Sequence, residues 1–255
     1  MRYLDLNCDL GESYGAFRMG EDERVLEFVT SANVACGMHA GDPVVMRRTV
    51  RMCRETGVAV GAHPGYPDLW GFGRRPLPLT PDEVAAFVLA QVGALEAVAR
   101  SEGVGLQHVK PHGALYNVAA RERAVAEAIA EAVRSAWPEA ILVVLSGSES
   151  ERAARAAGLR VAREAFCDRG YLRDGSLLPR DRPGAVLTDL HEVASRAVRL
   201  AYGEPIPTAD GGEVVVQADT LCIHGDTPGA AQLAAAVRAA LEEAHVRVQP
   251  MAAWL

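Results

Sequence analysis

The sequence contains few aromatic residues, which make up 5% of its 255 residues, and its five cysteines show no CxxC spacing. An odd number of cysteines without paired spacing predicts reduced thiols packed in a core, which is the usual state of cysteine in the cytoplasm. A net charge of −7 without a basic block argues against nucleic acid and anionic membranes as partners. No run of about 18 apolar residues occurs, and charged and polar residues interrupt the first ten positions. We therefore expect neither a membrane span nor a signal peptide.

Several catalytic and nucleotide-binding motifs are missing as well. The chain has no GxxxxGK[ST] loop, no GxSxG elbow and no HExxH pair, so it predicts neither a P-loop site nor a serine nucleophile. The stretch "GFGRRP" lacks the third glycine of a dinucleotide fingerprint and does not open a helix. A thiol nucleophile stays open at Cys36, which lies near His39, with tight packing as the alternative.

Short apolar runs alternate with helical patterns along the whole chain. Seven runs are expected to be strands: "YLDLNC", "ANVAC", "VAVGAH", "LQHVKP", "ILVVLS", "RVAREAF" and "TLCIHG". Helices are expected over 43–56, 81–100, 121–136, 188–202 and 229–244, the second with a capping box from Thr80 to Glu83. This alternation predicts βαβ units and a parallel sheet. We favour a single-domain (βα) barrel over 1–255, with a doubly wound open sheet as the alternative.

Polar and titratable side chains follow nearly every predicted strand. In chain order they are Asn7, Asp9 and Glu12; Asn33, His39 and Asp42; His63, Asp68, Arg74 and Arg75; Lys110, His112, Tyr116 and Asn117; Glu164, Asp168 and Arg169; and His224 and Asp226. In a parallel barrel the carboxyl ends of the strands meet on one face, where such folds keep their active sites. We therefore expect one shared pocket, with the long connections 64–79 and 168–187 at its rim.

Each of these groups also has a structural explanation. Asp42 and Asp226 each precede a proline and could cap helices, and Arg74 and Arg75 could be solvated loop charges. A single histidine at a strand end is more often structural than catalytic. Four histidines at four strand ends nevertheless favour a site: His39, His63, His112 and His224. The other three, His108, His191 and His245, lie in or beside predicted strands and helices and are treated as structural.

Long motifs identify a resemblance. The stretches "DLNCDLGESYG", "SANVACGMHAGDP", "GAHPGYPDLWGFGRR", "VKPHGALYN", "EAFCDRGY" followed by "LLPR", and "CIHGD" occur in this order. Together they resemble the LamB/YcsF family over residues 3 to about 250. The resemblance implies a seven-stranded (βα) barrel of the glycoside hydrolase/deacetylase type. It also implies ATP-dependent opening of 5-oxoproline to glutamate, together with the B and C subunits of a 5-oxoprolinase.

The residue types at the strand ends suit that chemistry. A lactam is a poorly electrophilic amide, which ATP can activate by phosphorylating the carbonyl oxygen before water attacks. Opening then needs a base for the water, an acid for the ring nitrogen and cations for the phosphate. We expect the catalytic groups to be Asp9, Lys110, His112, His224 and Asp226. We expect the substrate-binding groups to be Asn7, Glu12, Asn33, His39, His63, Arg74 and Arg75.

Alternatives to this function stay open. Metal-dependent carbohydrate deacetylases of this barrel type hold a divalent cation with one aspartate and two histidines, and Asp9, His63 and His112 resemble that set. This similarity implies one divalent metal ion, unless the three residues do acid/base work alone. A non-catalytic binding module is disfavoured, because a binder would not need so many titratable groups. We also expect the isolated chain to be inactive, because the reaction consumes ATP and no P-loop occurs.

Overall fold

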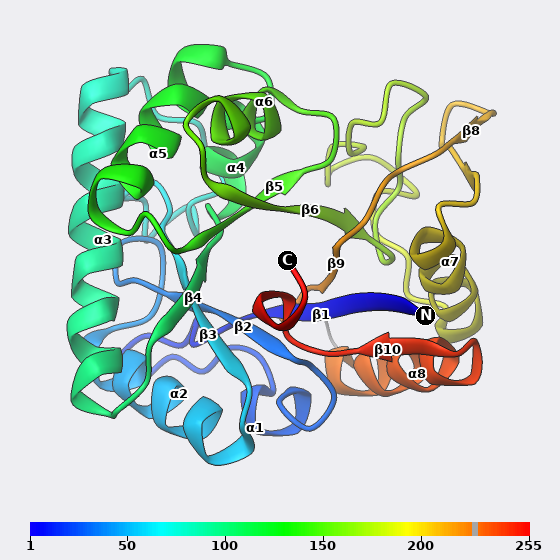
Figure 1. Cartoon of the computed structure of the whole chain (residues 1–255), viewed down its shortest axis with the longest axis horizontal. Helices are drawn as coiled ribbons and strands as arrows, with labels where there is room; N and C mark the ends of the chain where they lie inside the picture. Colours follow the sequence, from blue (N-terminus) through cyan, green and yellow to red (C-terminus); the bar gives the residue numbers. More distant parts are fainter. Residues whose placement is uncertain (226–228) are drawn as a thin grey trace.

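Seven parallel strands form a closed barrel in the computed structural model, which describes residues 1–225 and 229–255 (Figure 1). They are β1 (Arg2–Leu10), β2 (Ser31–Ala35), β3 (Ala59–His63), β4 (Leu106–Val109), β5 (Ile141–Leu145), β6 (Arg160–Phe166) and β9 (Thr220–Ile223). Each strand pairs in parallel with the next, and β9 pairs with β1 to close the ring. The predicted barrel is therefore confirmed, and the open sheet is wrong.

Helices fill the connections and surround the barrel. Five match the expected ones: α2 (Pro43–Thr56), α3 (Pro81–Ser101), α5 (Arg123–Ala136), α7 (Leu190–Tyr202) and α8 (Ala230–Glu243). Three shorter helices were not predicted: α1 (Asp22–Val25), α4 (Gly113–Ala119) and α6 (Glu149–Ala156). The predicted capping box is present, since Thr80 accepts from the backbone of Glu83 and Glu83 accepts from the backbone of Thr80. Asp42 caps α2 by accepting from two backbone N–H groups.

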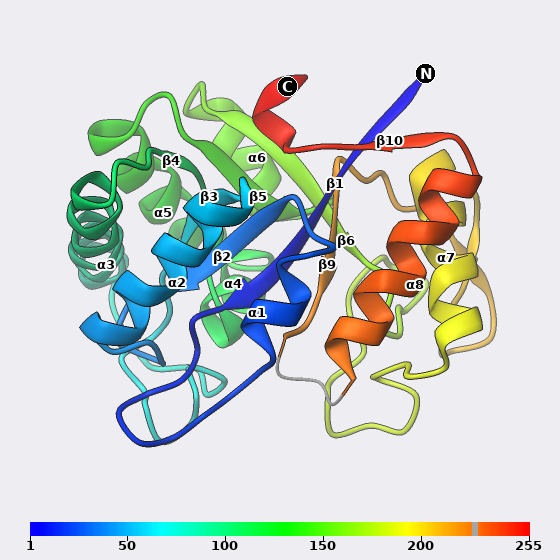
Figure 2. The same cartoon turned by 90° about the horizontal axis from the view of Figure 1, so that it is seen from below.

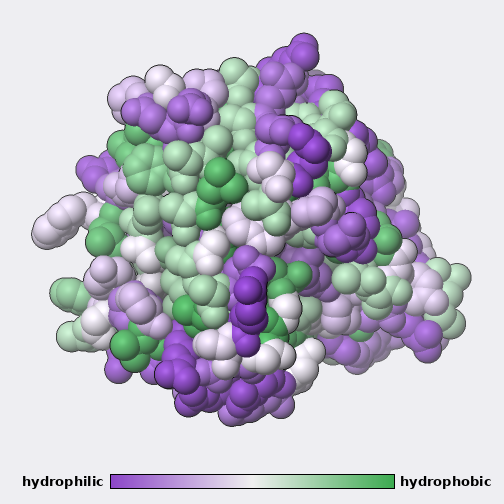
Figure 3. Space-filling view, turned by 60° about the vertical axis from the view of Figure 1, so that its left-hand side comes forward, coloured by the Kyte–Doolittle hydropathy of each residue, from purple (hydrophilic) through white to green (hydrophobic). Residues whose placement is uncertain are grey.

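Helix α3 is long and apolar enough, by length and composition alone, to cross a membrane. Its buried apolar residues, Val84, Val88, Val92, Leu95 and Ala99, recur at helical spacing and form one stripe. The helix packs against α2 and α5 and against strands β3 and β4. Figure 3 brings this side of the molecule forward and shows hydrophobic and hydrophilic groups intermixed on its surface. The pattern is typical of a helix that covers a barrel.

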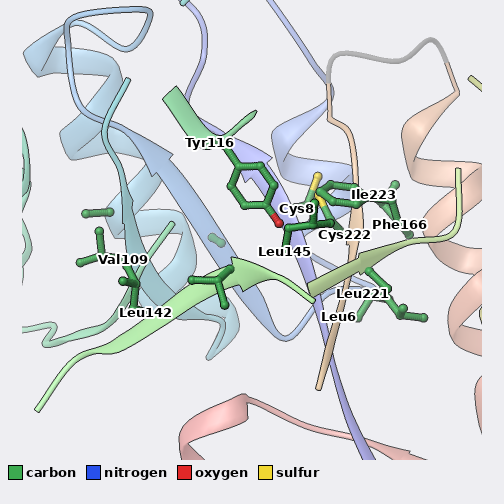
Figure 4. Close-up of a cluster of buried hydrophobic side chains, with 14 of the residues drawn as sticks. Leu6, Cys8, Val109, Tyr116, Leu142, Leu145, Phe166, Leu221, Cys222 and Ile223 are labelled. Carbon is green, nitrogen blue, oxygen red and sulfur yellow. The ribbon is translucent and has the colours of Figure 1, made fainter. Parts of the chain in front are cut away.

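The alternation in β1 sorts its side chains between two environments. Leu4, Leu6 and Leu10 are buried in the hydrophobic core, part of which Figure 4 shows around β1, β5, β6 and β9. Asn7 instead lies inside the barrel, where it contacts side chains of β2, β6 and β9. Asp5 likewise contacts side chains of β2 and β9. The barrel interior is therefore partly polar. All five cysteines are buried and free.

The chain's C-terminal segment covers the amino end of the barrel. Strand β10 (Val246–Val248) pairs with the start of β1, and the 3-10 helix η1 (Met251–Ala253) follows it. Met251 is fully buried against Ile141, Val143 and Ala162 of β5 and β6. Figure 2 shows η1 at one end of the barrel, with the long loops at the other. A short antiparallel pair, β7 (Ile206–Pro207) and β8 (Glu213–Val214), lies outside the barrel. The open end is thus the carboxyl end of the strands.

Candidate active site

A cavity of about 330 Å³ opens at the carboxyl end of the barrel. Five strand-end residues line it: Asp9, His63, Lys110, His112 and His224. The two long connections, 64–79 and 168–187, contribute Arg74 and the segment Leu177–Arg180, and Arg121 comes from the end of the connection after α4. Acid/base groups and cations thus face the same space.

Lys110 is the only lysine in the chain, and it is buried at the floor of this cavity. Its ammonium donates to Asp9 Oδ1 at 2.9 Å, to Glu164 Oε1 at 2.8 Å and to Asn7 Oδ1 at 3.2 Å. Burial by itself would lower the pKa of Lys110, but Asp9, Cys222 and Glu164 outweigh it and hold the pKa well above its usual range. Lys110 is therefore a fixed positive charge rather than a base.

Asp9 is held in its ionised form. Its Oδ1 accepts from Lys110 and, at 2.8 Å, from the side-chain amide of Asn33, while its Oδ2 lies 3.4 Å from Nε2 of His63. Burial alone would raise the pKa of Asp9, but the charges of His63 and Lys110 outweigh it and bring the pKa well below its usual range. Asp9 can therefore orient His63 and stabilise a positive charge there, but it does not carry a proton.

Three imidazoles lie in contact beside Asp9, two of them stacked and the third, His63, edge-on to both. His63 Nδ1 lies 2.7 Å from the carbonyl oxygen of Lys110, and His63 Nε2 lies 3.0 Å from Nδ1 of His112. His112 Nε2 lies 2.8 Å from the carbonyl oxygen of Phe72, and the His39 ring stacks on His112 at 3.8 Å between centroids. Burial and the neighbouring imidazoles hold the pKa values of His39 and His112 well below the usual range. Both rings are therefore favoured as neutral.

These histidines belong to a cluster that could hold a metal ion. Ligand atoms of Glu12, His39, His63 and His112 all lie within 4.8 Å of one another, and all four residues are buried. A second such group comprises Asp9, Cys222 and His224. Burial, however, raises the pKa of the Cys222 thiol well above its usual range, despite the nearby Lys110. Without a metal ion this thiol is therefore protonated, and a metal would bind it only with release of that proton.

His224 forms a carboxylate–imidazole pair with Asp168 at the cavity. Its Nδ1 lies 2.8 Å from Oδ2 of Asp168, and its ring stacks on Phe166 at 5.4 Å between centroids. Burial would raise the pKa of Asp168, but His224 outweighs it and the pKa lies below its usual value. The ionised carboxylate accepts from Nδ1, which leaves Nε2 of His224 as a proton acceptor at the cavity.

The arginines near the cavity have different roles. Arg169 is buried and donates to the carbonyl oxygens of Ala185 and Leu178, so it ties down the 168–187 loop. Arg74 lies over the ring of Phe72 at 4.9 Å and lines the cavity. Arg121 and Arg180 also line it, Arg121 exposed and Arg180 half-buried. Arg74, Arg121 and Arg180, which we call the cavity arginines, can therefore meet an anion.

Some predicted site residues lie away from the cavity surface. Asn7 and Asn33 sit beneath it, where they bind each other and Asp9. Glu12 and His39 lie behind His112, in the metal-capable cluster. Arg75 is exposed and forms an ion pair with Asp68, with its Nε 2.9 Å from Oδ2, so it is not brought into the cavity. Asp226 lies outside the residues that the structure describes.

Other groups at the site were given no catalytic or binding role from the sequence. Asp168, Arg121, Arg180 and Phe166 contact or line the cavity. Asp168 stood at a strand end in the sequence, and Arg180 closes the "LLPR" motif, so both carried a signal. The single lysine was a further signal, because a chain with so many arginines has no general need for one buried ammonium.

The thiol alternative at Cys36 is not supported. Its Sγ donates to the carbonyl oxygen of Val34 at 3.2 Å. Burial raises the pKa of Cys36 to about 12. The group is thus a protonated thiol packed in the core, not an activated nucleophile.

Comparisons with known proteins identify the family to which the chain belongs. The chain is 57% identical to the 5-oxoprolinase A subunit of Chloroflexus aggregans over 98% of this chain and 99% of that protein. It is 55% identical to the 5-oxoprolinase A subunit of Thermus thermophilus, over 96% and 98%. The crystal structure of a lactam utilization protein from Thermus thermophilus superimposes with a TM-score of 0.92 and 54% identity, covering 97% of this chain and 99% of that chain. The LamB/YcsF family profile matches residues 4–255, and the chain belongs to that family.

Proposed function

We propose that this chain is the A subunit of an ATP-dependent 5-oxoprolinase, which opens the lactam of 5-oxoproline to glutamate. The observation that carries the proposal is the nearly full-length identity of 57% to a protein named as the A subunit of 5-oxoprolinase. Carbohydrate deacetylation, the alternative that the barrel type allows, is not favoured, because the full-length relatives carry the 5-oxoprolinase name. The cavity supports the proposal because its groups match the needs of lactam opening.

The cavity has a suitable size and polarity for 5-oxoproline. About 330 Å³ is enough for a single five-membered ring with one carboxylate and one attacking water. The apolar side chains of Phe166 and Leu177 can contact the ring methylenes, while the cavity arginines can bind the carboxylate. The substrate would thus be oriented between an apolar wall and a cationic one.

Proton transfer falls to His224. In the arrangement that Asp168 imposes, Nε2 of His224 accepts a proton from water as the water attacks the activated lactam carbon. The same imidazolium can then return the proton to the ring nitrogen as the C–N bond breaks, which leaves γ-glutamyl phosphate. A second water then hydrolyses this acyl phosphate to glutamate and inorganic phosphate. Asp168 acts through His224, by fixing its tautomer and stabilising the imidazolium.

Lys110 and Asp9 supply fixed charge at the cavity floor. The ammonium of Lys110 can offset the negative charge of the phosphoryl group on the activated lactam, since it is prealigned and needs no reorganisation. Asp9 keeps that ammonium and His63 in place. Neither group needs to gain or lose a proton during the reaction.

ATP and a metal ion each have a role in the proposed reaction. Phosphorylation of the lactam oxygen would convert a poor electrophile into a good one, and the cavity arginines suit the phosphate that this places in the site. A divalent ion held by the histidine cluster would supply Lewis-acid charge close to Asp9 and His63. The residues fit such an ion because the donors are buried and converge from the ends of four successive strands.

Partner subunits B and C complete the proposed enzyme. The loop 64–79 exposes Trp70, 97% accessible, and Leu69, 47% accessible. Phe17, in the connection after β1, is 81% accessible. Large apolar side chains this exposed near an active site are typical of protein–protein contacts. We propose that this rim docks the partners, so that an activated lactam passes between subunits without meeting bulk water.

Glutamate formation tests the proposal directly. The purified chain is assayed with ATP and 5-oxoproline, alone and after mixing with the B and C subunits from the same organism. We expect glutamate release only from the mixture, with ADP formed in step. Release of glutamate by the isolated chain would overturn the partner requirement. A mixture without ATP-linked glutamate release would overturn the function.

A further inference from the structure

Four buried donor groups converge beside the cavity from the ends of four successive barrel strands and the loops that follow them. Glu12 follows β1, His39 follows β2, His63 ends β3 and His112 follows β4. Their exposures lie between 1% and 6%, and their ligand atoms lie within 4.8 Å of one another. The proposed proton transfer at His224 does not use this cluster.

The outer nitrogens of two histidines are fixed by backbone carbonyls. A carbonyl oxygen only accepts, so His63 Nδ1 donates to Lys110 O and His112 Nε2 donates to Phe72 O. The inner nitrogens, His63 Nε2 and His112 Nδ1, then face each other at 3.0 Å. If both rings are neutral, two lone pairs point into the same space. A positive species must lie between or beside them, either a shared proton or a metal ion.

The surroundings of His39 distinguish between a shared proton and a metal ion. Both of its ring nitrogens are buried and have no hydrogen-bond partner among the described residues. A buried polar group left without a partner costs about 1–3 kcal/mol. One proton shared by His63 and His112 would leave His39 unsatisfied. A metal ion would instead bind Nε2 of His39, which lies 3.8 Å from Oε1 of Glu12, together with the two inner nitrogens.

The loop 64–79 is shaped around these rings. A Cβ atom at Gly73 would lie 2.8 Å from both His39 Cβ and His112 Cδ2, and one at Gly65 would lie 2.8 Å from His39 Nδ1. Phe72 has φ +54°, a strained value for a residue with a side chain. That conformation accompanies the carbonyl contact to His112. Backbone anchoring of ligating histidines is the usual outer support of metal sites.

We propose that Glu12, His39, His63 and His112 bind one divalent first-row transition ion. Three imidazole nitrogens and one carboxylate oxygen suit Zn²⁺ and ions of similar size, whereas Mg²⁺ and Ca²⁺ prefer oxygen ligands. This donor set shares two histidines with the Asp9, His63 and His112 set expected from sequence. It omits Asp9, which converges instead with Cys222 and His224 in the second group. The proposal is about binding and does not depend on 5-oxoprolinase activity.

Metal content tests it without any turnover assay. The full chain is stripped with chelator, incubated with excess Co²⁺ and freed of unbound ion. Cobalt is then counted by mass spectrometry, and its visible absorption is recorded. We expect about one Co²⁺ per chain, with the absorption of a nitrogen- and oxygen-ligated ion. A wild-type chain that retains no Co²⁺ would mean that a proton bridges His63 and His112, and the proposal would fail.

Four variants locate the ion. Glu12→Gln and His39→Gln should each weaken Co²⁺ binding at least about ten-fold. Asp9→Asn, which alters a carboxylate near the same histidines, should keep the ion, as should His191→Gln on the exposed side of α7. Circular dichroism checks that each variant folds. If His39→Gln does not fold, Co²⁺ binding by Glu12→Gln alone tests the donor set. Unchanged binding in Glu12→Gln, or loss of the ion in Asp9→Asn alone, would contradict this donor set.

Discussion

At the scale of single residues, the proposed proton transfer depends on His224. His224→Gln should lower kcat of the reconstituted enzyme by about 10²–10⁴, the usual effect of losing a positioned acid or base. His191→Gln, an exposed histidine, is the matched control and should leave kcat unchanged. Steady-state kinetics with saturating ATP measures both. Near-normal turnover by His224→Gln would remove this residue from the mechanism.

Asp168 should act only through that imidazole. Asp168→Asn keeps the shape but removes the charge that accepts from His224 Nδ1. We expect a lower kcat with KM for 5-oxoproline nearly unchanged, because Asp168 is fully buried and does not line the cavity. A variant whose KM rises while kcat is kept would show that Asp168 shapes the binding site instead.

Asp5 links stability to pH. Burial raises the pKa of Asp5 to about 6, despite hydrogen bonds from Ser31, Thr220 and Thr30. Between about pH 4 and pH 6 the native state therefore holds a proton that the unfolded chain has released, and stability falls as pH rises. A shift of about two units corresponds to about 3 kcal/mol.

The measurement compares the wild type with Asp5→Asn by urea denaturation at several pH values. The stability difference, wild type minus variant, should be larger at pH 4 than at pH 7 by about that amount. Parallel stability curves for the two proteins would contradict the assignment to Asp5.

Lys110 should matter for folding as well as for catalysis. Lys110→Met leaves the carboxylates of Asp9 and Glu164 buried without their shared cation. Breaking a buried ion pair from one side costs about 3–5 kcal/mol. Arg123→Ala, which removes an exposed ion pair with Glu127, is the control and should cost at most about 1 kcal/mol. Equal urea midpoints for the two variants would refute a structural role for Lys110.

At the scale of elements, the loop 64–79 holds the histidine cluster in place. Gly73 has φ +62°, and a Cβ there would contact His39 and His112. Gly73→Ala should therefore destabilise the fold by about 1–3 kcal/mol and reduce metal binding. Gly105→Ala is the matched control, since nothing lies within 4 Å of a Cβ at Gly105 and its φ is not positive. Similar melting temperatures for both variants would contradict this role of the loop.

Strands and long helices were predictable because each has a strong local pattern. The alternation in "YLDLNC" and the capping box at Thr80 are local signals, and both elements formed where expected. Strand β10 was missed because its three residues carry little periodicity and its pairing with β1 joins opposite ends of the chain. Helix α4 was missed because seven residues beside a strand end do not establish a helical period.

The site was only partly predictable for a related physical reason. The strand-end rule placed Asp9, His63, Lys110, His112 and His224 on one face, and they line one cavity. This rule does not predict which side chains contact one another, because those contacts depend on the conformations of the loops. Arg75 points away from the cavity and pairs with Asp68, whereas the backbone conformation at Phe72 places its carbonyl oxygen in contact with His112.

At the scale of the whole molecule, the exposed apolar rim predicts partner binding. Trp70→Ser removes the most exposed large apolar side chain near the cavity without altering the barrel. We expect weaker assembly with the B and C subunits and lower turnover of the mixture, with an unchanged melting temperature of the chain. Leu190→Ser, an exposed apolar residue at the start of α7, is the control. Size-exclusion chromatography that shows normal assembly of Trp70→Ser would exclude this residue from the interface.

The proposed function requires 5-oxoproline to bind in the cavity at the carboxyl end of the barrel. A crystal structure of the chain with 5-oxoproline examines this requirement without any assumption about the partners. We expect the ring beside Phe166, the carboxylate on the cavity arginines, and the lactam group between His224 and Lys110. Ligand bound at another surface, with this cavity holding only solvent at saturating 5-oxoproline, would show that the substrate site lies elsewhere.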